Sequence, residues 1–134
     1  MGLISMAAVE ELTDSRLYEH EARLFRRKVV DGDRVAAIFE RFATEERLHH
    51  EILRGMATID ELGAAATSKP PFSDSLRESL RTHVERELRS IHALEELLKD
   101  REDPRQRITI KGIRADEKEH LETALRYLKA LQSR

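Results

Sequence analysis

Apolar residues recur at intervals of three and four positions through most of the chain, which is the spacing of amphipathic α-helices. Four segments carry this pattern, at residues 10–30, 34–62, 74–99 and 105–132. Breaks rich in Gly, Pro, Asp and Ser separate the segments, at residues 31–33, 64–73 and 100–104. This layout predicts an all-α fold, a four-helix bundle made of two helical hairpins, with residues 1–134 forming a single domain.

The second and fourth predicted helices share one motif, a Glu followed three positions later by a His. The pair is Glu46 and His49 in the second helix, and Glu117 and His120 in the fourth. In both, an apolar residue lies four positions before the Glu and another lies four positions after the His. Each pair therefore lies on the stripe that faces the core, and can present an oxygen and a nitrogen to one point.

The first and third predicted helices can be overlaid in the same way. The overlay makes Glu19 and Glu85 equivalent positions beside the core stripe. The level along the second hairpin favours Glu87 instead, because Glu87 and Glu117 lie equally far from the turn. We give the helix face more weight, so Glu85 is the prediction and Glu87 the reserve.

Four carboxylates and two imidazoles inside a bundle need a compensating charge. Buried carboxylates without partners are costly, and several of them close together would hold protons. Two divalent cations neutralise four Glu side chains, and ligation by oxygen and imidazole suits iron, manganese or, less well for redox work, zinc. One Glu from each of two helices and a Glu-x-x-His from each of the others is the ligand set of dimetal carboxylate bundles.

Composition removes several classes of function. The chain has no Cys, which excludes thiol chemistry, Cys-ligated zinc and iron–sulfur centres. Its formal charge of −2 gives no reason to expect nucleic acid as a partner. No apolar run reaches the roughly 20 residues of a membrane span, and the N-terminal segment lacks the cationic flank of a signal peptide. We therefore expect a soluble, cytoplasmic protein.

From about residue 10 to residue 132 the chain resembles ferritin-like proteins of the rubrerythrin/erythrin type. The matching positions are Glu19, Glu46, His49, Glu85, Glu117 and His120, with residues 36–39 at the start of the second helix. The resemblance implies a crossover between the second and third helices and a centre of two iron ions per chain. Glu46 and Glu117 would bridge or clamp the ions, Glu19 and Glu85 would be terminal ligands, and each His would bind one ion.

The resemblance implies a di-iron oxidoreductase that reacts with O2 or H2O2, as a ferroxidase or a peroxidase-like enzyme. Tyr18 is then a candidate catalytic residue that hydrogen-bonds a ligand or supplies an electron. Because the rubredoxin module of rubrerythrins is absent, the electron donor is expected to be a separate molecule. Leu88 lies three residues after Glu85, where rubrerythrins carry an additional carboxylate, and this argues against efficient peroxide reduction.

Three other functions stay open on the sequence. They are an iron-sequestering protein without an organic substrate, a di-iron hydroxylase, and a helical scaffold without metal. Leu17 and Leu24 form a second stripe away from the face of Tyr18. If they are exposed they make an apolar patch, so we expect a homodimer or a larger homo-oligomer.

Overall fold

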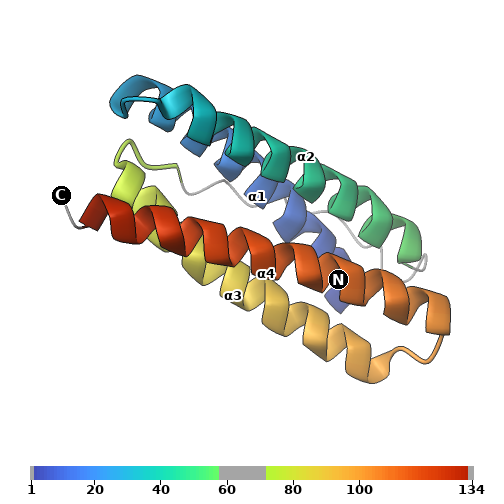
Figure 1. Cartoon of the computed structure of the whole chain (residues 1–134). Helices are drawn as coiled ribbons and strands as arrows, with labels where there is room; N and C mark the ends of the chain where they lie inside the picture. The colour runs from blue at the N-terminus through green and yellow to red at the C-terminus, as the bar shows by residue number, and fades with distance from the viewer. Residues whose placement is uncertain (1, 58–71, 133–134) are drawn as a thin grey trace.

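The computed structural model describes residues 2–57 and 72–132. It contains four helices, α1 (Leu3–Lys28), α2 (Gly32–Met56), α3 (Leu76–Asp100) and α4 (Pro104–Gln132), and the described residues include no strand. Helices α1 and α2 form one antiparallel hairpin and α3 and α4 form another, packed side by side (Figure 1). The predicted all-α bundle of two hairpins is confirmed.

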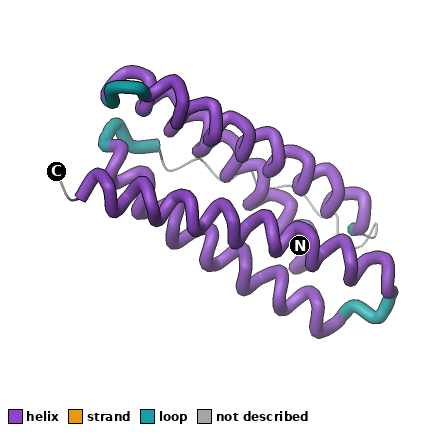
Figure 2. Tube along the Cα trace, viewed as in Figure 1, coloured by secondary structure: helices purple, strands orange, loops and turns teal. Residues whose placement is uncertain are grey.

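The ends of the helices differ from the prediction mainly at the N-terminus. Helix α1 begins at Leu3, seven residues before the predicted start, because Ile4 and Ala8 continue its buried stripe. The predicted end of the second helix and most of the predicted crossover, residues 58–71, lie outside the described residues. Helix α2 ends at one end of the bundle and α3 begins at the other, as a crossover requires (Figure 2).

The turn between α1 and α2 is tight and depends on two residues. Asp31 has a positive φ of 62°, in the left-handed region that short polar side chains tolerate. Gly32 packs directly on the backbone of α1, where an added Cβ would lie 1.9 Å from the carbonyl oxygen of Phe25. Only glycine allows the second helix to start this close to the first.

Each helix of the second hairpin begins with a side-chain cap. The hydroxyl of Ser75 accepts a hydrogen bond from the amide of Glu78, 3.2 Å away, at the start of α3. At the start of α4, Asp103 accepts a hydrogen bond of 2.9 Å from the amide of Arg105, and Pro104 is the first helical residue. These contacts satisfy amides that have no partner within the helix.

The apolar core consists of two clusters, one toward each end of the bundle. The first, near the α1–α2 turn, contains Tyr18, Ala22, Leu24, Phe25, Ala36, Phe39, Phe42, Ala43, Leu76, Leu80 and Leu128. The second, near the α3–α4 turn, contains Ile4, Ala8, Leu53, Leu94, Leu97, Leu98, Ile110 and Ile113. On every helix the residues of the candidate centre lie between the two clusters in sequence: Glu11 on α1, Glu46 and His49 on α2, Glu87 on α3, and Glu117 and His120 on α4. The bundle therefore holds a polar layer between two apolar ones.

The surfaces of these helices bear on two expectations from the sequence, the apolar patch and the membrane span. Leu17 and Leu24 are both fully buried, so the apolar patch on which the dimer prediction rested does not exist. They are buried because α1 is covered on both sides, by α2 and by α3 (Figure 1). In the described part of the chain, no helix has the length and apolar content needed to cross a membrane.

Candidate metal centre

The polar layer brings donor atoms from all four helices together at mid-height. One group consists of Glu11, Glu46, His49 and Glu117, and another of Glu46, Glu87, Glu117 and His120. In each group the donor atoms lie within 4.8 Å of one another and every residue is buried. Glu46 and Glu117 belong to both groups. The arrangement thus offers two adjacent ion positions that share two carboxylates.

The two halves of the centre mirror each other across the hairpins. Nδ1 of His49, on α2, lies 3.0 Å from Oε1 of Glu117 on α4. Nδ1 of His120, on α4, lies 2.8 Å from Oε1 of Glu46 on α2, without the angles of a hydrogen bond. Each imidazole therefore meets the shared carboxylate of the opposite hairpin.

The outer nitrogen of each His is held by a further acid. Nε2 of His49 lies 2.8 Å from Asp116, and Nε2 of His120 lies 3.0 Å from Glu45. Both acids immediately precede a shared Glu in the sequence, so the repeated motif is an acid followed by Glu-x-x-His. A carboxylate on the outer nitrogen fixes the ring and leaves Nδ1 to bind an ion.

Atoms without hydrogen-bond partners show where cations fit. Among the described residues, eight buried side-chain nitrogen and oxygen atoms have no such partner. All eight belong to one connected cluster: Glu11, Asp14, Glu46, His83, Glu87, Glu117 and His120. Buried polar atoms are normally paired. Six carboxylate oxygens and two imidazole nitrogens left free at one place are a donor set that fits divalent metal ions.

The pKa values of the buried carboxylates also fit a site for metal ions. Burial, reinforced by the charge of Glu11, raises the pKa of Glu46 and of Glu117 well above the usual value. Burial also raises the pKa of Glu11 to about 7. Burial opposes ionisation of Glu87 too, but its close contacts with Glu117 and with the charged imidazole of His83 lower its pKa to about 2. Without metal the centre therefore retains protons, and two cations would take their place.

Two predicted residues lie outside the centre. Glu19 is half-buried, with its side chain 42% exposed, and forms an ion pair with Arg47 on α2. Glu85 is exposed to solvent. The structure does bring together Glu46, His49, Glu117 and His120, and it places the reserve residue, Glu87, among them.

The physical reason for the correction on α3 is rotation about the helix axis. Glu85 lies two positions from Glu87, which is about 200° around a helix. The buried stripe of α3 runs through His83, Glu87 and Leu94, whereas Leu88 is 52% exposed. The overlay of the first and third helices therefore selected the wrong face of α3.

The residue that α1 contributes was missed because the helix starts earlier than predicted. With the true start, the buried stripe runs through Ile4, Ala8, Glu11 and Tyr18 at steps of four, three and seven residues. Glu11 lies about two turns before Tyr18 on this stripe, and Glu19 lies beside it. The apolar residues at the N-terminus were the signal that could have found Glu11.

Tyr18 lies against the centre, as its position beside the core stripe suggested. Its hydroxyl is fully buried and donates a hydrogen bond of 2.8 Å to Oε1 of Glu87. Its ring centroid lies 3.7 Å from that of His83 and 5.5 Å from that of His120. Burial and the charge of Glu87 raise the pKa of Tyr18 well above 10, so the phenol keeps its proton.

A second polar network adjoins the centre between α1 and α3, and no motif in the sequence predicted it. Nδ1 of His83 lies 2.6 Å from Glu21, and Nε of Arg86 lies 2.5 Å from Asp14. Burial would lower the pKa of His83, but the charge and hydrogen bond of Glu21 raise it to about 10. Burial, with the charge of Glu87, raises the pKa of Asp14 to about 7.

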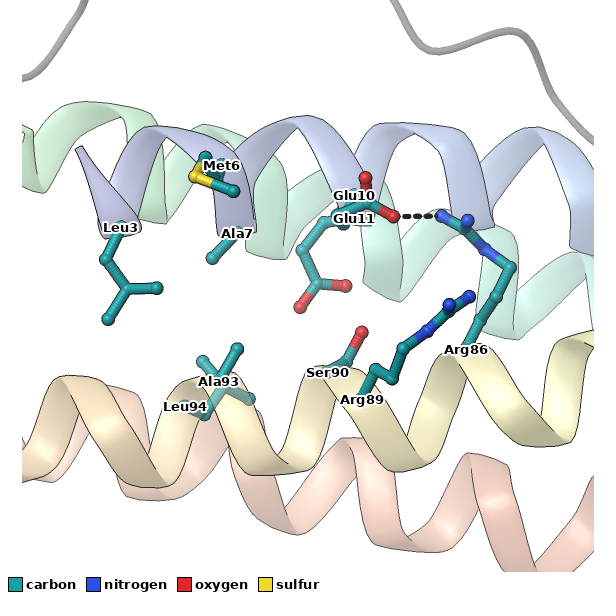
Figure 3. A pocket seen from close by; sticks show the side chains of 10 residues that line it. All are labelled: Leu3, Met6, Ala7, Glu10, Glu11, Arg86, Arg89, Ser90, Ala93 and Leu94. Carbon is teal, nitrogen blue, oxygen red and sulfur yellow. Dashed lines mark hydrogen bonds and ion pairs between the residues drawn. The ribbon is translucent and has the colours of Figure 1, made fainter. Parts of the chain in front are cut away.

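A pocket of about 420 Å³ opens between the start of α1 and the middle of α3. Figure 3 shows Leu3 and Ala7 facing Ala93 and Leu94, with Arg86 bonded to Glu10 at the polar end. Glu11 and Ser90 also line the pocket. Among the six residues of the two groups, Glu11 is the one that reaches this pocket, so a small molecule can approach the centre from its side.

Comparison with known proteins agrees with this layout. The family model described as Rubrerythrin matches residues 3–128, nearly the whole chain. No curated protein and no solved structure gives a significant match. The matched range includes every residue of both ligand groups.

Proposed function

The chain belongs to the rubrerythrin family of ferritin-like di-iron proteins, and on that basis we propose that it is a di-iron oxidoreductase that reacts with O2 or H2O2. We further propose that Glu11, Glu46, His49, Glu87, Glu117 and His120 hold the two ions. The family match supports the di-iron character of the centre, and the ligand assignment is supported by the two overlapping donor groups.

One observation carries the proposal above the others. Glu46 and Glu117, from opposite hairpins, belong to both donor groups, and each has a carboxylate oxygen without a hydrogen-bond partner among the described residues. Two ions held by shared carboxylates act as one two-electron centre. A pair of ferrous ions, when bound, supplies two electrons at one place to O2 or H2O2.

The side chains around the centre perform three tasks. Asp116 and Glu45 orient the two imidazoles, so that Nδ1 of each faces inward. Tyr18 holds one oxygen of Glu87 through its hydroxyl and leaves the other without a partner. The two apolar clusters on either side exclude water along the bundle axis, which leaves the pocket beside Glu11 as the approach for a small oxidant.

The residue three positions after Glu87 bears on which oxidant is used. The rubrerythrin pattern has an additional carboxylate three residues after this ligand, and in this chain Ser90 occupies that position. Ser90 lines the pocket but supplies no carboxylate. We therefore place oxidation of ferrous iron by O2 ahead of peroxide reduction.

The test measures iron stoichiometry and oxidation together. Metal-free protein is loaded with ferrous iron without oxygen, freed of unbound iron, and then mixed with O2 or with H2O2 while the absorbance of ferric iron is recorded. We expect two rapidly oxidised irons per chain, and loss of this phase in Glu46→Ala and Glu117→Ala.

Matched controls come from the two acids that the structure places outside the centre. Glu19→Ala and Glu85→Ala remove carboxylates from the same helices as Glu11 and Glu87, and both should retain the wild-type oxidation phase. An unchanged phase in the Glu46 and Glu117 variants, or its loss in the two controls, would contradict the proposal.

A further inference from the structure

A third group of donor atoms adjoins the two described above. Asp14, His83 and Glu87 each offer one atom, and these atoms lie within 4.8 Å of one another. Their side chains are fully buried. Asp14 and His83 belong to neither of the first two groups, while Glu87 links this group to the second.

His83 has the geometry of a ligand whose outer nitrogen is already held. Its Nδ1 lies 2.6 Å from Oε1 of Glu21, and the other oxygen of Glu21 accepts a hydrogen bond of 2.6 Å from Ser79. Its Nε2 has no hydrogen-bond partner, and it lies 3.3 Å from Oε1 of Glu87 and 4.0 Å from Oδ1 of Asp14. In the first two groups, His49 and His120 are likewise each held by a carboxylate on the outer nitrogen.

Asp14 and Glu87 each have one oxygen that accepts a hydrogen bond and one oxygen that has no partner. Oδ1 of Asp14 accepts a hydrogen bond from Nε of Arg86, and Oε1 of Glu87 accepts one from the hydroxyl of Tyr18. Oδ2 of Asp14 and Oε2 of Glu87 have no partner. Each member of the group is thus oriented by a neighbour and retains one unpaired donor atom.

The charges around this group also leave room for a divalent cation. The four Glu side chains of the first two groups are balanced by two divalent ions. Outside them, Glu10, Asp14 and Glu21 carry three negative charges when ionised, against one positive charge on Arg86. With His83 neutral, as a metal ligand must be, two negative charges stay unbalanced, and the buried part of this charge, on Asp14 and Glu21, is costly without a cation.

We propose that Asp14, His83 and Glu87 bind a third divalent transition-metal ion beside the pair. Two carboxylate oxygens and one imidazole nitrogen suit Zn²⁺, Mn²⁺ or Fe²⁺. The proposal rests on the proposed function in one respect, since Glu87 then serves both the pair and the third ion. In the metal-free protein, a proton on His83 competes with the metal ion for this site.

The test counts ions with Zn²⁺, which binds without redox chemistry. Metal-free protein is saturated with Zn²⁺, passed through gel filtration, and analysed for zinc per chain by mass spectrometry. We expect three ions in the wild type and two in His83→Gln and in Asp14→Asn. His92→Gln is the matched control, because His92 lies on the same helix with its side chain 76% exposed, and it should retain three.

Two further measurements locate the third ion and check that each variant is folded. Anomalous diffraction at the zinc edge should show a third peak bounded by Asp14 and His83, and circular dichroism checks that each variant is folded. If Asp14→Asn does not fold because Arg86 loses its partner, His83→Gln carries the test. Two ions in the wild type, with no peak beside His83, would show that a protonated imidazole is the only cation there and would overturn the proposal.

Failure of the third site is distinguishable from failure of the proposed function. Two ions in the wild type that are both lost in Glu46→Ala would leave the di-iron centre standing and refute the third site. A single ion in the wild type that is lost in His83→Gln but kept in Glu46→Ala would support the third site and refute the di-iron centre.

Discussion

Two acids outside the ligand groups orient the imidazoles of the proposed di-iron centre. Asp116 holds His49, and Glu45 holds His120, at distances of 2.8 and 3.0 Å. Each acid comes from the hairpin opposite to its imidazole. The orientation of each ring thus depends on both hairpins being docked correctly.

Removing either acid should weaken the binding of one ion. In Asp116→Asn and Glu45→Gln the outer nitrogen of the His loses a charged partner, and we expect metal affinity at that position to fall about 10- to 100-fold. Competition of Zn²⁺ with a chromophoric chelator measures this, and Glu122→Gln, an exposed acid of α4, should bind as the wild type does. Equal affinity in all four proteins would show that these contacts do not tune the metal.

Tyr18 should matter for stability even without metal. Tyr18→Phe deletes the hydroxyl that donates to Glu87 and leaves a buried carboxylate oxygen without a partner. We expect the free energy of unfolding of the metal-free protein to fall by about 1–3 kcal/mol, measured by urea denaturation at pH 7. Tyr127→Phe, in the same apolar cluster, should change it by less than about 0.5 kcal/mol. Equal effects of the two substitutions would count against a special role for this hydrogen bond.

At the scale of elements, the α1–α2 turn sets how the first hairpin closes. Gly32→Ala places a Cβ 1.9 Å from the carbonyl oxygen of Phe25, so the helices must separate. We expect a loss of about 2 kcal/mol or more in the free energy of unfolding. Gly112→Ala is the matched control, because nothing lies within 4 Å of a Cβ added at this exposed position of α4.

The two glycine substitutions should have opposite signs. Replacing an exposed glycine within a helix by alanine stabilises by about 0.8–1 kcal/mol, so Gly112→Ala should melt above the wild type and Gly32→Ala below it. Thermal melts followed by circular dichroism compare the three proteins. A destabilised Gly112 variant, or an unchanged Gly32 variant, would refute this account of the turn.

At the scale of the whole molecule, the proposed metal ligands come from both hairpins. Glu11, Glu46 and His49 come from one hairpin, and Glu87, Glu117 and His120 come from the other. Ions bound between them would favour the docked arrangement over the unfolded chain. Binding of metal should therefore raise the stability of the entire bundle, by about 4 kcal/mol when the free ion exceeds its dissociation constant a thousandfold.

This coupling predicts opposite pH trends with and without metal. In the metal-free protein the pKa of Glu11 and of Asp14 is raised to about 7, so the folded state binds more protons than the unfolded chain. Stability is therefore complete at low pH and is lost as the pH rises from about 4.5 through 7. The raised pKa of His83, about 10, adds a further loss above pH 6.5, while the lowered pKa of Glu87 acts only below pH 4.5.

Melting temperatures measured between pH 5 and pH 8 check the trend. The metal-free protein should melt several degrees lower at pH 8 than at pH 5, and the zinc-loaded protein should not, because ions bind the ionised carboxylates more tightly as the pH rises. Glu46→Ala should give the same weak response to zinc at both pH values. A metal-free protein that is more stable at pH 8 would contradict the buried, proton-retaining centre.

The spacing of apolar residues was enough to predict the four helices, their pairing into hairpins, and the two Glu-x-x-His motifs. Those motifs can be read from one helix at a time, because the i, i+3 spacing and the apolar residues on either side define a face without reference to any other helix. The acid that precedes each motif was equally visible, but its partner lies on the opposite hairpin. Only the tertiary structure could show the contacts of Glu45 and Asp116.

Tertiary structure also decided which acids of α1 and α3 enter the centre. Both helices are rich in Glu, and a single carboxylate carries no motif, so the choice depends on where the helix starts and how it is rotated. On α1, which begins seven residues before the predicted start, the buried stripe passes through Glu11 and leaves Glu19 beside it, and on α3 a rotation of two positions brings Glu87 rather than Glu85 inward. Asp14 and His83 are buried for the same reason. The packing of α1 against α3 is a long-range contact that local periodicity does not record.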